Sequence, residues 1–312
     1  MPMITTVTLN TSIDKAYSIS SPLEVGTVMR VSSCIDNAGG KGLNASRAIA
    51  TAGEQVLATG FVGGNNGRLL CELLERDGIP EDFVHVEAET RCCVNVLEPS
   101  GRSTEFLEPG RPVSEDEVKE VVERVARLAE RSSIVTFCGS TPAGMPDDIY
   151  VRLIDVVHQS GARAILDTSG RLLERGIVAK PDLVKPNSDE IGALLGRKVE
   201  NPDEVADAAV QLHERGVAQV VVSLGSKGAL MACDEGVFLG TPPHIEVVNP
   251  VGSGDTMVGT FAVAMARGMG PADQLRFAMA CATANCLSAS TGHFELSVAE
   301  KLAPEVLVER VR

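Results

Sequence analysis

The middle of the chain reads Ile134-Val135-Thr136-Phe137-Cys138, then a helical pattern over Asp147–Gln159, then Arg163-Ala164-Ile165-Leu166-Asp167. Short apolar runs are typical of buried strands, and longer stretches with apolar residues every three or four positions are typical of helices. A strand, a helix and a second strand in this order indicate parallel pairing. The stretch therefore predicts an α/β fold with a mainly parallel central sheet and helices on both faces.

The same alternation continues on both sides of this stretch. Ile4–Leu9 reads as the first core strand and Gly42–Ala52 as a helix, while Val217–Leu224 reads as a strand and Gly254 begins a long helix. No long linker, low-complexity tract or internal repeat interrupts the sequence. We therefore expect one domain over residues 1–312.

Two further segments have β character outside this rhythm. Ala16–Ile19 and Thr27–Ile35 read as short half-exposed strands, and Cys92–Leu97 with Ser103–Leu107 reads as a hairpin. We expect these insertions, at about 15–35 and 91–108, to form one small accessory sheet that covers the main domain as a lid.

The composition restricts the class of protein. Hydrophobic residues make up 44% and charged residues 22%, which excludes a disordered, collagen-like or coiled-coil chain. With 28 Lys and Arg against 42 Asp and Glu, the net charge is −14, so the overall field repels nucleic acid and anionic membranes. A binding site for a phosphorylated substrate would need local basic groups.

Other features narrow the location and the partners. No apolar run approaches the ~18 residues of a membrane span, and Met1–Asn10 lacks the pattern of a secretory signal, so we expect a cytoplasmic protein. The eight cysteines show no Cys-x-x-Cys spacing, which favours reduced, mostly buried thiols over disulfides or zinc. Tryptophan is absent, which argues against a surface that stacks nucleic-acid bases.

One glycine-rich stretch has the chemistry of an anion site. Asn249-Pro250-Val251-Gly252-Ser253-Gly254-Asp255 precedes an apolar segment, Thr256–Ala266, that reads as a helix. Glycines let backbone N–H groups converge on an anion, and the helix N-terminus adds about half a positive charge. Asp255 could accept a proton from a hydroxyl while these N–H groups neutralise a phosphoryl group. The alternative is that Gly254-Asp255 only turns the chain and caps the helix.

A second glycine-rich turn, Ala38-Gly39-Gly40-Lys41-Gly42-Leu43-Asn44, also leads into a helix. It is not a Walker A loop, because no Gly-Lys-Ser or Gly-Lys-Thr occurs in the chain. A complete Gly-x-Gly-x-x-Gly is also missing, which disfavours the usual dinucleotide binding.

Three other elements are candidates for ligand contacts. Lys185-Pro186-Asn187-Ser188-Asp189-Glu190 closes the expected strand Asp182–Lys185 at the sheet edge where ligands bind, although Asn187 and Glu190 could simply form a capping box. Ser223-Leu224-Gly225-Ser226-Lys227-Gly228 ends a strand and could be only a turn. Asp14 follows the first strand and could bind sugar hydroxyls or serve only as a turn residue.

Taken together and in this order, these motifs resemble the PfkB carbohydrate kinase family, which has the ribokinase-like fold. Within the family the chain looks like the 1-phosphofructokinase and tagatose-6-phosphate kinase branch, on Thr8-Leu9-Asn10, the Gly39-Gly40-Lys41-Gly42 loop, Glu89-Thr90-Arg91 and Gly139-Ser140-Thr141-Pro142. The resemblance implies an ATP- and Mg²⁺-dependent kinase.

The resemblance also implies a role for each matching residue. Asp255 corresponds to the catalytic base, and Gly252, Ser253 and Gly254 correspond to the anion hole. The other implied contacts are with the sugar (Asp14, Gly39, Gly40 and Asn44), with its existing phosphate (Arg30, Lys41, Arg91 and Ser140), with the nucleotide (Lys185, Asn187, Ser223, Gly225 and Gly228) and, through water, with Mg²⁺ (Glu190). His293 has no implied role.

The expected reaction is the phosphorylation of a ketohexose monophosphate, tagatose 6-phosphate or fructose 1-phosphate, to the 1,6-bisphosphate. The alternatives are a 6-phosphofructokinase of the same family, a kinase of a nucleoside or unphosphorylated sugar, and a sugar-phosphate sensor without catalysis. The expected partner is a small sugar phosphate, not nucleic acid or membrane, with a homodimer through the lid.

Overall fold

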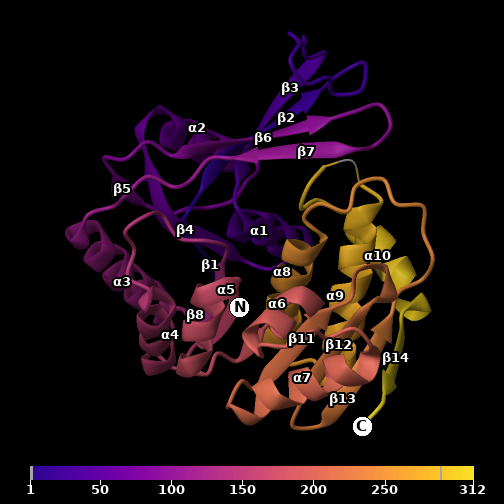
Figure 1. The fold of residues 1–312 in the computed structure, drawn as a ribbon. Helices are drawn as coiled ribbons and strands as arrows, with labels where there is room; N and C mark the ends of the chain where they lie inside the picture. Colours follow the sequence, from indigo (N-terminus) through magenta and orange to yellow (C-terminus); the bar gives the residue numbers. More distant parts are fainter. Residues whose placement is uncertain (1–2, 289) are drawn as a thin grey trace.

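The computed structural model describes residues 3–288 and 290–312 (Figure 1). Within these residues, seven strands of the larger sheet run parallel: β1 (Met3–Thr8), β4 (Val56–Gly63), β5 (Val84–Val86), β8 (Ser132–Cys138), β9 (Arg163–Asp167), β10 (Leu183–Val184) and β11 (Gln219–Ser223). Three more extend it in antiparallel fashion: β12 (Ala229–Cys233), β13 (Gly236–Thr241) and β14 (Leu307–Arg310). The strand order is β14-β13-β12-β11-β10-β9-β8-β1-β4-β5.

This arrangement confirms the predicted α/β fold with a mainly parallel sheet. The antiparallel edge was not anticipated. It arises because only Asp234 and Glu235 separate β12 from β13, and so short a loop joins antiparallel neighbours.

Helices cover both faces of the sheet, as predicted. One face carries α1 (Lys41–Thr51), α2 (Gly64–Arg76), α8 (Ser253–Ala266) and α9 (Pro271–Cys286), whose apolar side chains share one core cluster. The other face carries α3 (Glu115–Ala129), α4 (Ile149–Gln159), α5 (Gly170–Gly176), α6 (Ser188–Leu194) and α7 (Pro202–Glu214), with a second cluster. The short α10 (Leu296–Leu302) packs with α1 and α9 in a third cluster.

Helix α8 lies deepest in the first of these layers. Every residue from Thr256 to Met265 is buried, because α8 packs between α1 and α9. A side chain on Gly259 would overlap the backbone of Ala45, so the two helices approach closely only with glycine there. This contact fixes the position of the N-terminus of α8 relative to α1.

The smaller sheet, here called the lid sheet, contains β2 (Ser12–Ser18), β3 (Ser33–Gly39), β6 (Arg91–Leu97) and β7 (Ser103–Leu107) in the order β3-β2-β6-β7. It projects above the rest of the molecule (Figure 1). The predicted strand Thr27–Ile35 is wrong in its bounds, because the strand begins at Ser33 and continues to Gly39. Pairing with β2, which places Asn37 opposite Asp14, supplies the hydrogen bonds that extend it.

Two other expectations concern membranes and thiols. In the residues that the structure describes, no helix is long and apolar enough to cross a membrane. All eight cysteines are free. Four of them are buried, whereas Cys34 is exposed and Cys71, Cys92 and Cys286 are half-buried, so the expected burial holds for only half of the thiols.

Candidate active site

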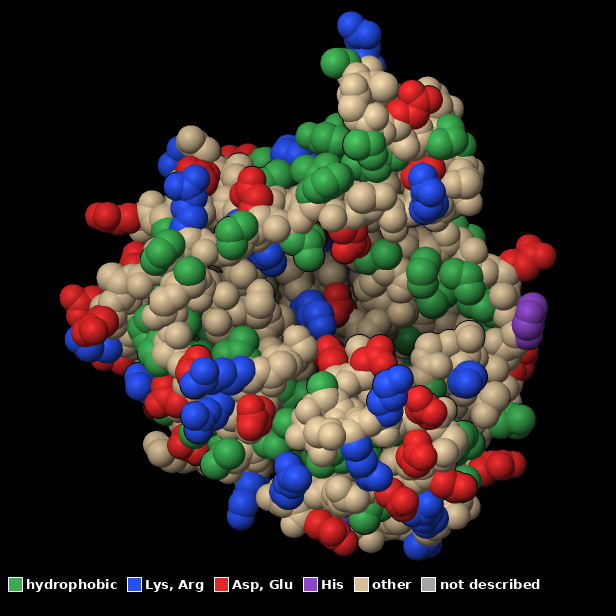
Figure 2. All heavy atoms as spheres, viewed as in Figure 1, with side chains coloured by type: hydrophobic (Ala, Val, Ile, Leu, Met, Phe, Trp, Pro, Cys, Tyr) green, Lys and Arg blue, Asp and Glu red, His purple; other side chains and the backbone are tan. Residues whose placement is uncertain are grey.

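The carboxyl ends of the parallel strands bring polar residues, among them the predicted Ser140, Lys185 and Ser223, towards one edge of the larger sheet. Asn10 follows β1, Ser140 follows β8, Asp167 ends β9, Lys185 follows β10 and Ser223 ends β11. Ligands bind at this edge in open α/β sheets. In Figure 2 the surface is hollowed beneath the lid sheet, and charged side chains of both signs gather in the hollow.

Asp255 lies in the first turn of α8, where backbone N–H groups have no partner within the helix. Gly252 is the N-cap, with a left-handed φ of 81°, and no side chain among the described residues caps this end. The Asp255 carboxylate instead accepts a hydrogen bond of 2.8 Å from Nδ2 of Asn44 on α1. Asp255 is therefore not the cap of its helix. The Ser253 N–H donates to the Pro250 carbonyl over 3.3 Å, whereas the N–H groups of Gly254 and Asp255 have no acceptor among the described residues.

The loop before α8 is held by buried polar contacts. Nδ2 of Asn285, which is fully buried, donates to the Val251 carbonyl over 3.1 Å, and Thr256 Oγ1 donates to Asn285 Oδ1 over 3.2 Å. A side chain on Gly252 would come within 2.7 Å of the Gly292 nitrogen. Both the left-handed φ and this close approach require glycine at position 252.

Two lysines and a buried aspartate surround the same point. Asp167 is 3% exposed, and its two oxygens lie 3.3 Å from Lys185 Nζ and 3.6 Å from Lys41 Nζ. The carboxylate of Asp167 raises the pKa of Lys41, so this amine stays charged. Sequence reasoning missed Asp167 as a site residue, although its place at the carboxyl end of the strand Arg163–Asp167 was a usable signal.

These charges also act on Asp255. Burial raises the pKa of its carboxyl group to about 6, and the neighbouring Asp167 charge acts in the same direction. Lys41, Asn44 and Lys185 oppose the rise. A carboxylate with this pKa is ionised at neutral pH and is more basic than an ordinary aspartate, as a general base should be.

Asp14 lies on strand β2, not in a loop, and faces the glycine-rich turn. A side chain on Gly39 would overlap the Asp14 carboxylate, so that glycine permits the contact. Ser12 Oγ donates to Asp14 over 2.6 Å, and burial raises the pKa of Asp14 despite this bond. Asp14 therefore lies against Gly39, which with Gly40 leads into α1, and Asn44 on α1 contacts Asp255.

A cleft of about 720 Å³ lies between the lid sheet and the main domain. Its polar lining residues include Asp14, Asn37, Asn44, Arg47, Asn95 and His293. Its size is that of a site for a small molecule, and its polar walls suit a ligand with many hydroxyl groups. His293, which had no implied role, is exposed on the rim of this cleft.

The four residues predicted to bind the sugar's phosphate do not all meet. Arg91 donates to the carbonyl of Asn10 over 3.1 Å, and Asn10 Nδ2 donates to Ser140 Oγ over 3.0 Å, so Arg91 and Ser140 lie together. Lys41 points instead to Asp167. Arg30 is exposed in the loop 19–32, which joins β2 and β3 at the end far from Asp14, and the structure does not bring it to the others.

The predicted nucleotide residues lie on two adjacent loops, which are joined by a bridge between Asn187 and Ser223. Asn187 and Glu190 do form a reciprocal capping box for α6, with distances of 2.8 and 2.9 Å. The glycine at position 228 is also required by the structure, since a side chain there would overlap the Gly240 carbonyl. The structural roles that the sequence analysis gave as alternatives, a capping box and a turn, are therefore present. The outward faces of both loops are still open to a ligand.

Comparison with known proteins identifies the family. The sequence model described as pfkB family carbohydrate kinase matches residues 7–297. A structure of phosphofructokinase-2 from Escherichia coli in complex with fructose-6-phosphate is 30% identical, with a TM-score of 0.91, and the match covers 98% of this chain and 99% of that one.

Two other solved structures are similar over nearly their whole length. A possible 1-phosphofructokinase from Thermotoga maritima is 28% identical, with a TM-score of 0.91 and coverage of 99% and 100% of the two chains. Ribokinase from Arabidopsis thaliana, complexed with ribose and ATP, is 25% identical, with a TM-score of 0.76 and coverage of 97% and 98%. The predicted ribokinase-like fold is thereby confirmed.

Proposed function

The chain belongs to the pfkB family of carbohydrate kinases, and on that premise we propose that it moves the γ-phosphoryl group of ATP to a primary hydroxyl of a ketohexose monophosphate. The product is a 1,6-bisphosphate. Tagatose 6-phosphate and fructose 1-phosphate are the leading substrates, and fructose 6-phosphate is the third. The observation that carries the proposal is the Asp255 carboxylate beside the N–H groups of Gly254 and Asp255 at the N-terminus of α8, which have no acceptor in the part of the chain that the structure describes.

Asp255 accepts the proton of the attacking hydroxyl, and the oxygen of that hydroxyl forms the new bond to phosphorus while ADP leaves. The N–H groups of Gly254 and Asp255 face the negative charge that spreads over the transferring group. Lys41 and Lys185, held by Asp167, add positive charge on the other side. Because these groups are fixed before substrate arrives, little reorganisation accompanies the transfer.

Recognition of the sugar's first phosphate falls to Arg91 and Ser140. Arg91 can grip a phosphate with two N–H groups, which a lysine cannot do. Arg91 also provides a local positive potential for a phosphorylated substrate, which the net charge of −14 would otherwise repel. Asp14 and Asn44 provide hydrogen-bond partners for the sugar hydroxyls.

The residues present suit Mg²⁺ that arrives with ATP. Among residues 3–288 and 290–312 no group of three carboxylate, histidine or cysteine side chains forms a dedicated metal cage. Oδ2 of Asp167 is buried without a hydrogen-bond partner, and Glu190 lies at the same edge of the sheet, so one or two carboxylates are available, as Mg²⁺ on phosphates requires. When bound, the ion neutralises charge on the phosphates.

A homodimer through the lid sheet is part of the proposal. Ile35 is 58% exposed and Leu107 is 65% exposed, and both line the cleft on the open face of this sheet. A second lid sheet could cover such apolar side chains.

The direct test is a substrate comparison with purified protein. ADP release with MgATP should depend on one of the three ketohexose monophosphates, with much higher kcat/KM than for fructose, tagatose or ribose. Higher kcat/KM for a phosphate-free sugar would overturn the assignment of a phosphorylated substrate. Tight sugar-phosphate binding without ADP release would indicate a sensor instead.

A further inference from the structure

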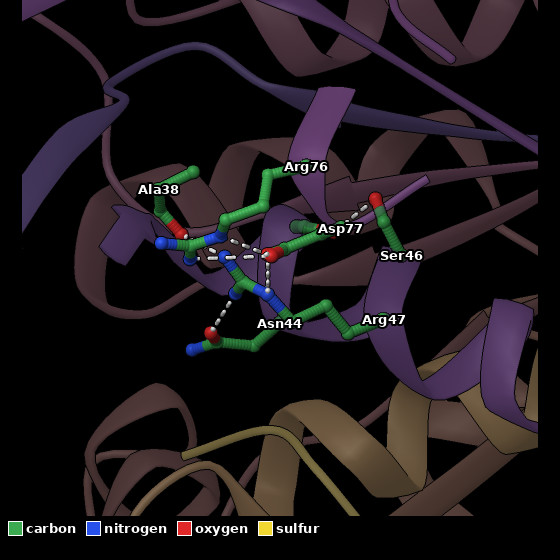
Figure 3. Close-up of polar contacts among 7 residues, drawn as sticks. Ala38, Asn44, Ser46, Arg47, Arg76 and Asp77 are labelled. Atoms are coloured by element: carbon green, nitrogen blue, oxygen red, sulfur yellow. Dashed lines mark hydrogen bonds and ion pairs between the residues drawn. The ribbon is translucent and has the colours of Figure 1, made fainter. Parts of the chain in front are cut away.

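One arginine that the proposed mechanism does not use contacts Asn44, the residue that donates a hydrogen bond to Asp255. Arg47 comes from the second turn of the buried helix α1, and only 12% of its side chain is exposed. Its guanidinium donates in three directions, to Asp77 Oδ2 over 3.0 Å, to the Ala38 carbonyl over 2.6 Å and to Asn44 Oδ1 over 3.1 Å (Figure 3).

The contact with Asn44 decides which way the amide of that residue faces. A guanidinium can only donate hydrogen bonds, so the amide atom next to Arg47 must be the oxygen. The amide nitrogen then faces the opposite way, where it donates to Asp255 Oδ2 over 2.8 Å. If the amide rotated by half a turn, its oxygen would face the Asp255 carboxylate and repel it.

The other two contacts anchor the guanidinium. Asp77 caps the end of α2, and its carboxylate is 22% exposed, so the ion pair lies partly out of water. Ala38 belongs to β3 and precedes Gly39, against which the Asp14 carboxylate packs. One side chain therefore connects α2, the end of a lid strand and the residue that holds Asp255.

We propose that Arg47 is a positioning residue: it fixes the amide of Asn44 so that its nitrogen faces Asp255, and it ties that amide to the strand end beside Asp14. The inference rests on the proposed function, in which Asp255 is the base and Asp14 binds the sugar. Arg47 itself touches neither reacting group. Its role requires a planar group with several donors, which arginine has and lysine lacks.

The test uses Arg47→Lys, which keeps the positive charge and removes the three-way geometry. Arg76→Lys is the matched control, because Arg76 also contacts Asp77, over 3.3 Å, but shows no bond to Asn44 or Ala38. We expect Arg47→Lys to lower kcat by about ten- to a hundredfold, as displaced catalytic groups do. KM for ATP should change less than twofold, and Arg76→Lys should leave both constants unchanged.

A second measurement needs no activity. The difference in free energy of unfolding between the wild type and Asp255→Asn, measured against pH, reports the ionisation of Asp255. Because the pKa of Asp255 is higher in the folded state than in the unfolded state, the wild type loses stability relative to the variant as the pH rises towards the folded-state pKa. Above that pKa the difference stays constant. When Arg47→Lys is added to both proteins, the pH at which the difference becomes constant should rise by about half to one unit, because Asn44 no longer holds its hydrogen bond to the ionised Asp255. The other groups that face Asp255, namely Asp167, Lys41 and Lys185, are unchanged in all four proteins.

These readouts separate the two proposals. If no ketohexose phosphate is turned over by the wild type, the proposed function fails, while the pH shift still tests Arg47. A folded Arg47→Lys variant in which both kcat and the pH at which the difference becomes constant are unchanged would overturn the positioning role. Should Arg47→Lys fail to fold, Asp77→Asn removes only the anchor and should shift that pH in the same direction, and no shift there would equally overturn the role.

Discussion

The lid sheet and the loop that leads into α8 line the same cleft, but the lid sheet and α8 differ in how deeply they are buried. Every residue of α8 from Thr256 to Met265 is buried, whereas β7 of the lid sheet has four exposed residues and one half-buried residue. Buried, densely packed elements open rarely, and exposed strands open easily. The difference teaches that the groups proposed to transfer the phosphoryl group lie on the more deeply buried part of the molecule, and those proposed to bind the sugar lie partly on the more exposed part, which we expect to move more.

The largest effect expected from the rigid region follows Asp255→Asn. The replacement is nearly isosteric, so the fold should persist, while loss of the proton acceptor should lower kcat by about 10²- to 10⁴-fold. Affinities for sugar and ATP should change little. Near-normal kcat at saturating substrate would remove Asp255 from the mechanism.

Lys41→Ala tests to which of the two regions Lys41 contributes, because the lysine could contact either the sugar's phosphate or the transferring phosphoryl group. Its amine lies 3.6 Å from Asp167, on the side of the transferring group, so we expect kcat to fall by about 10²-fold, as when one charge-stabilising donor is lost. KM for the sugar phosphate should stay within a few-fold of the wild type. A selective rise in that KM instead would assign Lys41 to the sugar's phosphate.

Arg91→Ala tests the sugar side. Loss of a charge-assisted contact with phosphate should raise KM for the sugar phosphate by about 10- to 100-fold. KM for ATP should hardly change. Equal increases for both substrates would show that Arg91, which also bonds to the carbonyls of Asn10 and Glu108, acts mainly by holding the lid strand β6 in place.

The pH dependence follows from the burial of Asp255. A base must be ionised to accept a proton, and the pKa of this carboxyl group is about 6. Thus kcat/KM should be level above neutral pH and should fall about tenfold per unit below pH 6. A fall that begins only near pH 4 would mean that the active base has the pKa of an ordinary aspartate.

The smallest effect concerns the lid sheet. Its segments 12–39 and 91–107 should exchange amide hydrogens several-fold more slowly when a ketohexose monophosphate is bound, and much less so with ATP alone. Closure over the sugar would exclude water and so suppress ATP hydrolysis. Unchanged exchange at saturating sugar would show a rigid sheet or a permanent interface, and the two regions would then not differ in mobility.

The sequence predicted the larger sheet better than the site. The bounds of strand Arg163–Asp167 were predicted correctly, because its apolar residues are bounded by a charged residue at each end. The bounds of β3 were wrong, since its pairing with β2 overrides the weak strand preference of Asn37, Ala38 and Gly39.

Within the site, glycine-rich stretches carried the strongest signal. Gly252 and Asp255 were found because glycines before a helix are typical of an anion site and because the order of the motifs resembles the pfkB family. Asp167 and Arg47 were missed because a lone aspartate or a mid-helix arginine is usually on the surface. Their burial depends on Lys185, Asp77 and other residues that are distant in sequence. The placing of Arg30 beside Arg91 was inferred from resemblance alone, and within one chain the loop 19–32 keeps it apart.

The strand order of the larger sheet bears on how the chain becomes active during its synthesis. From β8 to β14 each new strand adds to the same growing edge, so the sheet can lengthen as the chain leaves the ribosome. Asn44 emerges early, but Asp255 follows 211 residues later, roughly 10–40 s at ordinary rates of translation. The sugar-side residues Asp14 and Asn44 are thus made long before Asp255, but Thr291 and His293, which also line the cleft, are made after it. An unfinished chain that lacks Asp255 therefore also lacks part of the cleft.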